Sequence, residues 1–467
     1  MIPQRLSWLL EPDGVPMQLA RLFTESGHRL YLVGGSMRDV LLDRPHFDLD
    51  FTTNARPDQI KKAVAGWADG LFTVGEAFGT IGVVKDGHTH EVTTFRSEVY
   101  RTDSRKPQVA FSDDLEVDLS RRDFTVNAIA LQLPQPEVVD PYGGLEDLNA
   151  RVLRTPLAPE VSFSDDPLRM LRLFRFMTTL GFDPDPATIE AVVGMADRLS
   201  IVSAERVRDE FSKLLVAPQP GTALMGLVRT GLAAHIVPEL ADLQMAQDPV
   251  HRHKDVLAHT IAVVDKTEPD LELRLAALLH DIGKPATRQF SDSGATFHHH
   301  EVVGARMARQ RLRELRYSKQ IVDDVNQLVF LHLRPHTFKM GWTDSAVRRY
   351  VRDAGHLLED LNQLVRSDVT TRNKARAHEI QNRIDELEER IARLREKEEL
   401  ESLRPPIDGN DVMAYLGISP GPRVGEVMNL LTEHRLDQGP YNPGDAYRLV
   451  REWAIEQGME DPGERAE

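Results

Sequence analysis

The chain contains no cysteine. Disulfide bonds and thiolate metal sites are therefore excluded, so any metal ion must be held by Asp, Glu or His side chains. The sequence also lacks an apolar run long enough to span a membrane. Its first residues, MIPQRLSWLLEPDG, have neither the basic start nor the long apolar stretch of a secretory signal. We therefore expect a cytoplasmic protein of bacterial type with no membrane partner.

Positive charge is scarce. Lys and Arg number 57 against 73 Asp and Glu, so the formal net charge is −16. This balance disfavours a protein that coats nucleic acid non-specifically, although RNA can still bind in a local basic groove. The 467 residues exceed what one compact core accommodates, and about two to four domains are expected.

The hydrophobic pattern predicts an α+β chain. Short β-rich runs such as RLYLVGG and HEVTTF indicate a small mixed α/β head over residues 1–155, and the Pro-, Ser- and Asp-rich segment TPLAPEVSFSDDP marks its end. The periodicity then becomes helical. It predicts a mostly all-α remainder, with a neck over 156–245, a His-rich body over 246–375 and a tail over 376–467.

Several helices carry local signals. LRMLRLFRFMTTL reads as a helix closed by Gly181, and Asp185-Pro186 and Ser203 read as the starts of the next two helices. In the tail, apolar residues recur at alternating steps of four and three: Ile380, Ile384, Leu387, Ile391 and Leu394. This stripe favours a helix packed on its own protein over an intermolecular coiled coil.

The segment LVGGSMRDVLLDRPHFDLDF carries the strongest signal for chemistry. An apolar strand runs into Gly34-Gly35 at the start of a helix. Two glycines there let the backbone and its free N–H groups approach a phosphate closely. Taken alone, the glycines are better explained by a plain strand-to-helix turn.

Two aspartates strengthen this signal. Alternate residues of a strand share a face, so Asp48 and Asp50 of FDLDF are expected side by side, with apolar residues on the other face. Adjacent carboxylates repel each other unless a cation lies between them, and Mg²⁺ prefers such oxygens. The alternative is a solvated acidic edge strand. Glu91, in another predicted strand, is the candidate third carboxylate.

These motifs resemble those of a known enzyme family. GGSMRD followed by DLD is similar to the polymerase-β-like nucleotidyltransferases. EVTTFR, RRDFTVNA, DPYGG and DDPLRMLRLFRF occur in the order found in the bacterial CCA-adding enzymes and their poly(A) polymerase relatives, the class II nucleotidyltransferases. The resemblance covers about residues 30–215. It implies template-independent addition of C and A to the 3′ end of tRNA from CTP and ATP. CC-only, A-only and poly(A) addition are close variants.

The resemblance also implies site residues. Asp48, Asp50 and Glu91 would be the catalytic carboxylates, and Mg²⁺ on them would lower the pKa of an RNA 3′-hydroxyl and stabilise the departing pyrophosphate. The implied nucleotide pocket comprises Gly34, Gly35, Arg38, Arg121, Arg122, Asp123 and Asn127. Arg can fork onto phosphate, and Asp or Asn can accept from a ribose hydroxyl. The alternative for Asp123 and Asn127 is the capping of a helix start.

In the same family, SDDPLRMLR acts as a protein template. Asp166 and Arg169 lie three residues apart and so share a helix face. The pairing edges of C and A both offer an amino donor beside a ring-nitrogen acceptor, which suits Asp166 and Arg169, whereas U and G oppose both. The alternative for Asp166 is an N-cap before Pro167. The family more often has Glu where this chain has Asp165, which leaves the role of that position open.

A second pattern is rich in histidine: HKDVLAHT, AALLHDIGKP, FHHHEVVGA, LVFLHLRPH and LVRSD. Imidazole and carboxylate together suit Zn²⁺, Mn²⁺, Fe²⁺, Co²⁺ or Ni²⁺. The pattern resembles the HD superfamily of metal-dependent phosphohydrolases. The matching positions are His259, His280, Asp281 and Asp368, and His300 and His332 match the extra ligands of dinuclear members.

Two other functions stay open at this point. The HD domain could carry the main activity as a phosphohydrolase, with the head a degenerate RNA-binding module. Fused nucleotidyltransferase and HD modules also occur in nucleotide-sensing regulators. The intact Asp48, Asp50 and Arg169 argue against the first, and RRDFTVNA and DDPLR against the second. HD domains also persist as structural appendages, so hydrolysis there is a hypothesis separate from metal binding.

Overall fold

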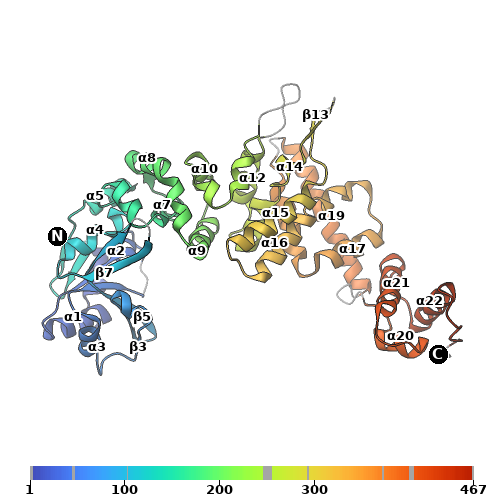
Figure 1. The fold of residues 1–467 in the computed structure, drawn as a ribbon, viewed down its shortest axis with the longest axis horizontal. Helices are drawn as coiled ribbons and strands as arrows, with labels where there is room; N and C mark the ends of the chain where they lie inside the picture. Colours follow the sequence, from blue (N-terminus) through green and yellow to red (C-terminus); the bar gives the residue numbers. More distant parts are fainter. Residues whose placement is uncertain are drawn as a thin grey trace. The chain divides into compact units, whose positions relative to one another are not determined.

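A computed structural model describes residues 4–44, 48–101, 104–245, 255–291, 294–370, 373–398 and 404–464. The chain forms two compact units (Figure 1). The first comprises Met1–Ala241 with Glu314–Arg316, and the second Asp242–Arg313 with Tyr317–Glu467. The large sheet lies in the first unit and helices dominate elsewhere, so the α+β fold class predicted from the sequence is confirmed.

A seven-stranded sheet of order β3-β4-β5-β2-β1-β8-β9 forms the head. Its strands are β1 Leu30–Val33, β2 Asp50–Thr53, β3 Gly70–Phe72, β4 Thr80–Lys85, β5 His88–Thr94, β8 Ala130–Leu133 and β9 Glu137–Val139. Strand β2 pairs antiparallel with β1 and parallel with β5. The predicted strand over FDLDF is shorter than expected, because β2 begins only at Asp50, and Phe47 lies outside the described residues.

Strand β1 is buried on both of its faces, whereas β2 alternates between the apolar Phe51 and the polar residues Asp50 and Thr52. Phe51, Val92 and Ile81 are buried in one cross-strand row, next to the row that contains Asp50 and Glu91. Helices α1 and α3 contact each other and pack on the sheet (Figure 1). The other head elements are η1 Gln4–Leu10, α1 Val15–Glu25, α2 Gly34–Leu41, α3 Pro57–Ala63, η2 Glu76–Phe78, β6 Arg96–Arg101, β7 Ser104–Phe111, α4 Leu115–Ser120, η3 Thr125–Asn127, α5 Gly144–Ala150 and β10 Val152–Leu153.

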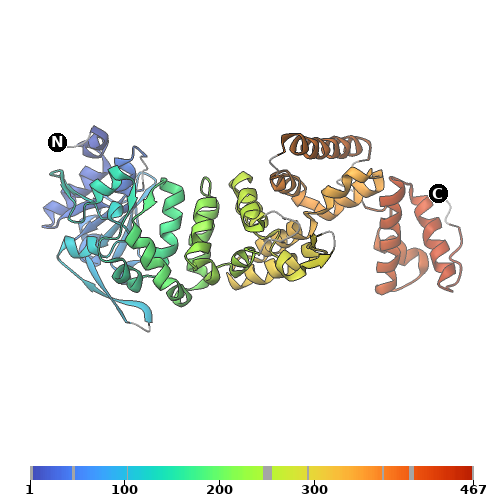
Figure 2. The same cartoon turned by 90° about the horizontal axis from the view of Figure 1, so that it is seen from above.

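The neck helices, green in Figures 1 and 2, follow the head within the first unit. They are α6 Pro159–Asp165, α7 Leu168–Leu180, α8 Pro186–Met195, η4 Ala196–Ile201, α9 Ala204–Leu215, α10 Gly221–Arg229, η5 Leu232–His235 and α11 Pro238–Asp242, with β11 Asp183–Pro184 between α7 and α8. Helix α7 packs against α9 and α10. It ends at Gly181, whose φ of 71° is left-handed, while Asp185 and Ser203 precede α8 and α9, so these predicted helix boundaries are confirmed.

The second unit is helical around α13. Its first part comprises α12 Val256–Lys266, α13 Leu271–Leu279, α14 Lys284–Thr287, β12 Gln289–Ser291, β13 Gly294–Thr296, α15 His300–Glu314, α16 Lys319–Leu331, η6 Arg334–Met340, α17 Asp344–Ala354, η7 Gly355–Leu357 and α18 Leu358–Asp368. Helix α13 is buried along most of its length and contacts α12, α16 and α18. His280 and Asp281, which follow α13 directly, therefore lie near the centre of this unit.

The chain ends in four helices: α19 Lys374–Glu398, α20 Gly409–Leu416, α21 Pro422–Gln438 and α22 Pro443–Glu456. The heptad stripe of α19 is buried at Ile384, Leu387, Ile391 and Leu394, and α19 contacts α17 and α18. The helix thus packs on its own chain, as the heptad stripe predicted. Within the described residues, every helix is too short or too polar to cross a membrane.

Candidate functional site

The β1–α2 turn has a conformation that only glycine adopts without strain. Gly34 has φ of +73° and opens helix α2. A Cβ added to Gly34 would lie 2.9 Å from Nη1 of Arg122 and 3.7 Å from Oδ2 of Asp50. The glycine therefore lets an arginine and a carboxylate approach the helix N-terminus together. The Ser36 hydroxyl, one turn into the helix, accepts a hydrogen bond from the Asp50 amide at 2.9 Å.

Asp50 and Glu91 form a carboxylate pair across two strands. They are direct partners in the parallel β2–β5 register, so their side chains project from the same face. Partial burial and the charge of Asp50 raise the pKa of Glu91. Repulsion of this kind is relieved when a cation lies between the carboxylates, so the pair suits Mg²⁺.

Asp48 lies in the bend before β2 instead of within the strand. Its Oδ1 accepts a hydrogen bond from the Thr89 amide at 3.2 Å and lies 3.8 Å from Nδ1 of His88, and its side chain is largely exposed. Within the described part of the chain, Asp48, Asp50 and Glu91 do not form a cluster whose ligand atoms all lie within 4.8 Å. The pair that the fold brings together directly is Asp50 with Glu91.

The RRDFTVNA residues form a closed polar network. Asn127 donates to Oδ1 of Asp123 at 2.8 Å and accepts from Nη1 of Arg38 at 2.7 Å. Arg172 of α7 donates from Nε to Oδ2 of Asp123 at 2.9 Å. Burial alone would raise the pKa of Asp123, but Arg172 and Asn127 outweigh it and hold that pKa well below its usual range. Asp123 also accepts from the adjacent Phe124 amide. The N-cap of η3 is Phe124 and has no side-chain capping bond, so neither Asp123 nor Asn127 caps this helix start.

Asp166 and Arg169 engage different partners. Arg169 is buried, and its Nη1 donates to the Ser162 hydroxyl at 2.8 Å. Asp166 accepts from Arg206 at 2.7 Å through one oxygen and from the Leu168 amide at 3.2 Å through the other. The N-cap position of α7 is Pro167, so Asp166 lies one residue before it, and only its bond to the Leu168 amide resembles the capping role that the sequence left open. Arg206 was missed by the sequence reasoning because it lies 40 residues away, on α9.

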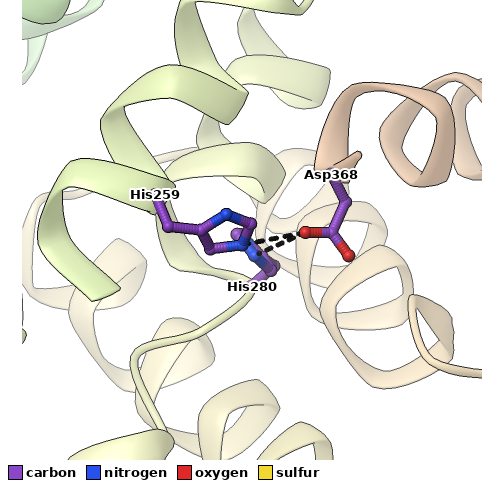
Figure 3. Close-up of side chains that lie close together, drawn as sticks. All are labelled: His259, His280 and Asp368. Atoms are coloured by element: carbon purple, nitrogen blue, oxygen red, sulfur yellow. Dashed lines mark ion pairs between the residues drawn. The ribbon is translucent and has the colours of Figure 1, made fainter. Parts of the chain in front are cut away.

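The second unit gathers six side chains that could hold metal ions. They form two sets, His259, His280 and Asp368, and Asp281, His300 and His332, and the ligand atoms of each set lie within 4.8 Å of one another. Figure 3 shows the first set, with the two imidazoles facing the carboxylate. All six positions singled out in the HD-like motifs thus meet, although they come from five separate helix ends or helices.

Short ligand distances connect the two sets. Nε2 of His259 lies 2.9 Å from Asp368 and 3.5 Å from Asp281. Asp281 lies 3.2 Å from Nε2 of His280 through Oδ2 and 3.4 Å from Nε2 of His300 through Oδ1. The Asp281 carboxylate therefore stands between imidazoles of both sets, as a bridging ligand would.

Three of the rings are oriented by their own helices. Nδ1 of each ring lies 2.6–2.8 Å from the carbonyl oxygen three residues earlier and can donate to it. The pairs are His280 with Ala277, His300 with Phe297 and His332 with Val329. This bond leaves Nε2 as the lone-pair nitrogen. In all three rings Nε2 is buried and, within the described residues, makes no hydrogen bond. Buried nitrogens of this kind fit a metal ion.

The pKa shifts of His332 and Asp281 favour ligation. Burial, helped by the charge of His280, lowers the pKa of His332 to about 3, so this ring is neutral at physiological pH. Burial would raise the pKa of Asp281, but His280, His300 and Lys284 outweigh it and hold that pKa well below its usual range. A neutral imidazole beside an ionised carboxylate is the form that binds a divalent cation.

Comparisons with known proteins match the regions of the chain that contain these residues. Residues 30–154 match the model of the poly(A) polymerase head domain, residues 181–244 that of the probable RNA- and SrmB-binding site of polymerase A, and residues 254–394 that of the HD domain. An A-adding tRNA nucleotidyltransferase of Deinococcus radiodurans is 35% identical over 91% of this chain and 95% of its own length. The chain belongs to the tRNA nucleotidyltransferase family.

Further relatives are named CCA-adding enzymes. The CCA-adding enzyme of Anoxybacillus flavithermus is 30% identical over 92% of this chain and 93% of its own length. The solved structure of the Bacillus stearothermophilus CCA-adding enzyme in complex with CTP aligns with a TM-score of 0.70 at 26% identity, covering 98% of this chain and 100% of that one. The family and enzyme class predicted from the motifs are confirmed.

The nucleotidyltransferase head also contains a buried acid that the sequence reasoning missed. Asp118 of α4 is fully buried and accepts hydrogen bonds from Arg121 at 2.8 Å and from Arg122 at 3.3 Å. It also accepts from the Thr52 hydroxyl, two residues beyond Asp50. Burial opposes its ionisation, but the two arginines lower its pKa. Its spacing of four from Arg122 was the available signal. Through these hydrogen bonds Asp118 connects Arg121 and Arg122 with β2, the strand that begins at Asp50.

Asp118→Asn is expected to lower stability by about 3 kcal/mol, because removing one member of a buried ion pair leaves its partners uncompensated. We also expect a higher KM for the nucleotide, since Arg121 and Arg122 lose the carboxylate that orients them. Thermal unfolding and steady-state kinetics measure the two effects. Glu116→Gln removes a charge from the exposed side of the same helix and serves as the control. Equal effects of the two variants would contradict a positioning role for Asp118.

Proposed function

We propose that this chain adds C, C and A in turn to the 3′ end of tRNA, using CTP and ATP. The observation that carries the proposal is the meeting of Asp50 and Glu91, paired across β2 and β5, with Gly34 and Arg122 at the N-terminus of α2. Gly34 and Arg122 suit a triphosphate, and the carboxylates of Asp50 and Glu91 suit a metal ion that binds the attacking hydroxyl. The relatives' names, CCA-adding enzyme and A-adding tRNA nucleotidyltransferase, support the choice of tRNA.

The direct test is to sequence the 3′ ends made on tRNA that lacks CCA. CTP alone should give products ending in CC, and CTP with ATP should give CCA. UTP and GTP should give little product. Failure to extend this RNA with both nucleotides present would refute the proposal.

A-only addition is the second candidate, because the Deinococcus relative carries that name and is 35% identical over most of the chain. A tRNA already ending in CC separates the two. An A-adding enzyme extends this RNA with ATP but leaves the tRNA without CCA unextended. The proposed enzyme extends both.

We propose that Asp50, Glu91 and Asp48 hold Mg²⁺ in the head. The bound metal would activate the RNA 3′-hydroxyl and neutralise charge on the pyrophosphate. Asp48 would turn from the Thr89 amide towards Asp50, which its exposed position in the bend permits. The chain itself binds and orients: the amides of Gly34 and Gly35 and the guanidinium of Arg122 would receive the phosphates.

Arg38, Asp123 and Asn127 would form part of the wall of the nucleotide pocket. Their hydrogen bonds are mutual, and Asp123 is also paired with Arg172 of the neck. We infer that this network fixes the ribose-binding surface and ties the head to α7. The groups that would face the base, Asp166 and Arg169, follow on the same stretch of chain.

Asp166→Asn is expected to raise the use of UTP and GTP relative to CTP and ATP about tenfold, since an amide both accepts and donates hydrogen bonds and so tolerates the carbonyl of U or G. Competition assays with paired nucleotides measure this ratio. Glu160→Gln changes an exposed carboxylate of α6 outside this motif and serves as the control for the loss of one negative charge. An unchanged ratio in Asp166→Asn would remove this residue from base selection.

We propose that the HD domain binds two divalent transition-metal ions and hydrolyses phosphomonoesters or phosphodiesters. His259, His280 and Asp368 would hold one ion, His300 and His332 the other, and Asp281 would bridge them. The bound metals would supply an activated water and neutralise the phosphate. The three buried Nε2 atoms without hydrogen bonds support metal binding over a purely structural domain. We place the whole enzyme in the cytoplasm, where tRNA is processed.

A further inference from the structure

An exposed aromatic residue shares the row of the sheet that carries the catalytic pair. Phe72 of β3 pairs with Gly82 of β4, Gly82 pairs with Glu91 of β5, and Glu91 pairs with Asp50 of β2. Direct cross-strand partners project from the same face of a sheet. Phe72 therefore stands on the carboxylate face.

Gly82 leaves room for the Phe72 ring. A Cβ added to Gly82 would lie 3.2 Å from Cβ and 3.6 Å from Cδ2 of Phe72. Because Gly82 has no side chain, the surface between Phe72 and Glu91 is flat, and 58% of the Phe72 residue surface is exposed. Leu71, the residue before Phe72 in β3, projects from the opposite face of the sheet.

The sheet order places Phe72 and the phosphate-binding turn on opposite sides of the carboxylates. The β1–α2 turn with Gly34 and Arg122 lies on the β1 side of Asp50, whereas β4 and β3 extend from the other side, beyond β5. In phosphoryl transfer the attacking and leaving oxygens are roughly in line. If the pyrophosphate leaves on the β1 side, the RNA 3′-hydroxyl approaches from the side of β4 and β3.

We propose that Phe72 is a stacking platform for an unpaired base near the 3′ end of the RNA acceptor. The inference rests on the proposed function of the head. Two strand spacings of about 4.8 Å place Phe72 about 10 Å from Glu91. That distance matches about three stacked nucleotides at 3.4 Å each. An aromatic face stacks on any base, which suits an acceptor end whose last bases change as nucleotides are added.

The test compares Phe72→Ala, Phe72→Leu and Phe72→Tyr, with Leu71→Ala as the control on the other face of the same strand. RNA affinity is measured without nucleotides, using a tRNA that carries 2-aminopurine near its 3′ end and is quenched when its base stacks. We expect Phe72→Ala and Phe72→Leu to weaken binding about tenfold and to lose quenching. Phe72→Tyr and Leu71→Ala should behave like the unchanged protein.

Steady-state kinetics provide the second readout. The KM for tRNA should rise in Phe72→Ala, while the KM for CTP and ATP should stay constant, because the ring lies away from the nucleotide turn. Equal binding by Phe72→Leu and Phe72→Tyr would overturn a stacking role. So would unchanged RNA affinity combined with altered sedimentation, which would indicate contact between protein copies. The unchanged protein's ability to extend tRNA tests the proposed function separately.

Discussion

Asp50→Asn is expected to reduce nucleotide addition on the order of 10³-fold or more, because loss of a charged group that stabilises the transition state has effects of this size. Asp50 opens β2 and is the register partner of Glu91, so the substitution removes one carboxylate of the pair that we propose binds Mg²⁺. Asn has nearly the same shape, and the Asp50 amide keeps its bond to Ser36. The fold should therefore survive, as circular dichroism and thermal unfolding can check.

The assay is single-turnover extension of tRNA with CTP and ATP. Asp58→Asn, at an exposed carboxylate of α3, controls for the loss of one negative charge from the head. Hydrolysis of a phosphodiester by the second unit should be unchanged in both variants. Extension at the unchanged rate in Asp50→Asn would exclude Asp50 from catalysis, and parallel loss of both activities would indicate misfolding.

Asp281→Asn is expected to remove most of the metal bound by the second unit and to abolish hydrolysis there. The Asp281 carboxylate lies 3.2–3.5 Å from the Nε2 atoms of three histidines, so its charge serves both ligand sets. An amide ligates divalent cations weakly because it carries no charge. Elemental analysis of protein dialysed against each candidate metal gives the number of ions bound per chain.

Two further variants make the metal experiment decisive. His300→Gln should lose one ion and keep the other, since His300 belongs to the second set only. Asp323→Asn, at an exposed carboxylate of α16, should keep the full complement. Addition of nucleotides to tRNA should persist in all three variants. A full metal load in Asp281→Asn would refute the proposed bridge.

The sequence was informative wherever a signal is local. The glycine turn at Gly34, the end of α7 at Gly181 and the starts of α8 and α9 after Asp185 and Ser203 depend on neighbouring residues, and the structure contains all of them. The meeting of the six histidine and aspartate side chains in two clusters could be predicted because a motif fixes their order, even though they lie on separate helices.

Contacts between distant segments could not be predicted in this way. Asp118 meets the Thr52 hydroxyl only because the fold packs Leu115 and Leu119 of α4 against the sheet. Arg206 reaches Asp166 from another helix. Nε2 of His336 lies 3.2 Å from Asp368, a contact to which no spacing pointed. Asp48 lies outside the strand predicted for it, and two-residue periodicity could not show this. Its carboxylate accepts a hydrogen bond from the Thr89 amide, from another strand.

The bonds between three imidazoles and carbonyls three residues earlier have a consequence for metal exchange. Each ring takes its orientation from covalently nearby backbone, so these three rings should keep their geometry when the proposed ions bind. Loading would then require little rearrangement, and one ion could replace another without unfolding the centre of the unit. Which element occupies the enzyme in the cell would follow the supply of each metal as much as the shape of the cavity.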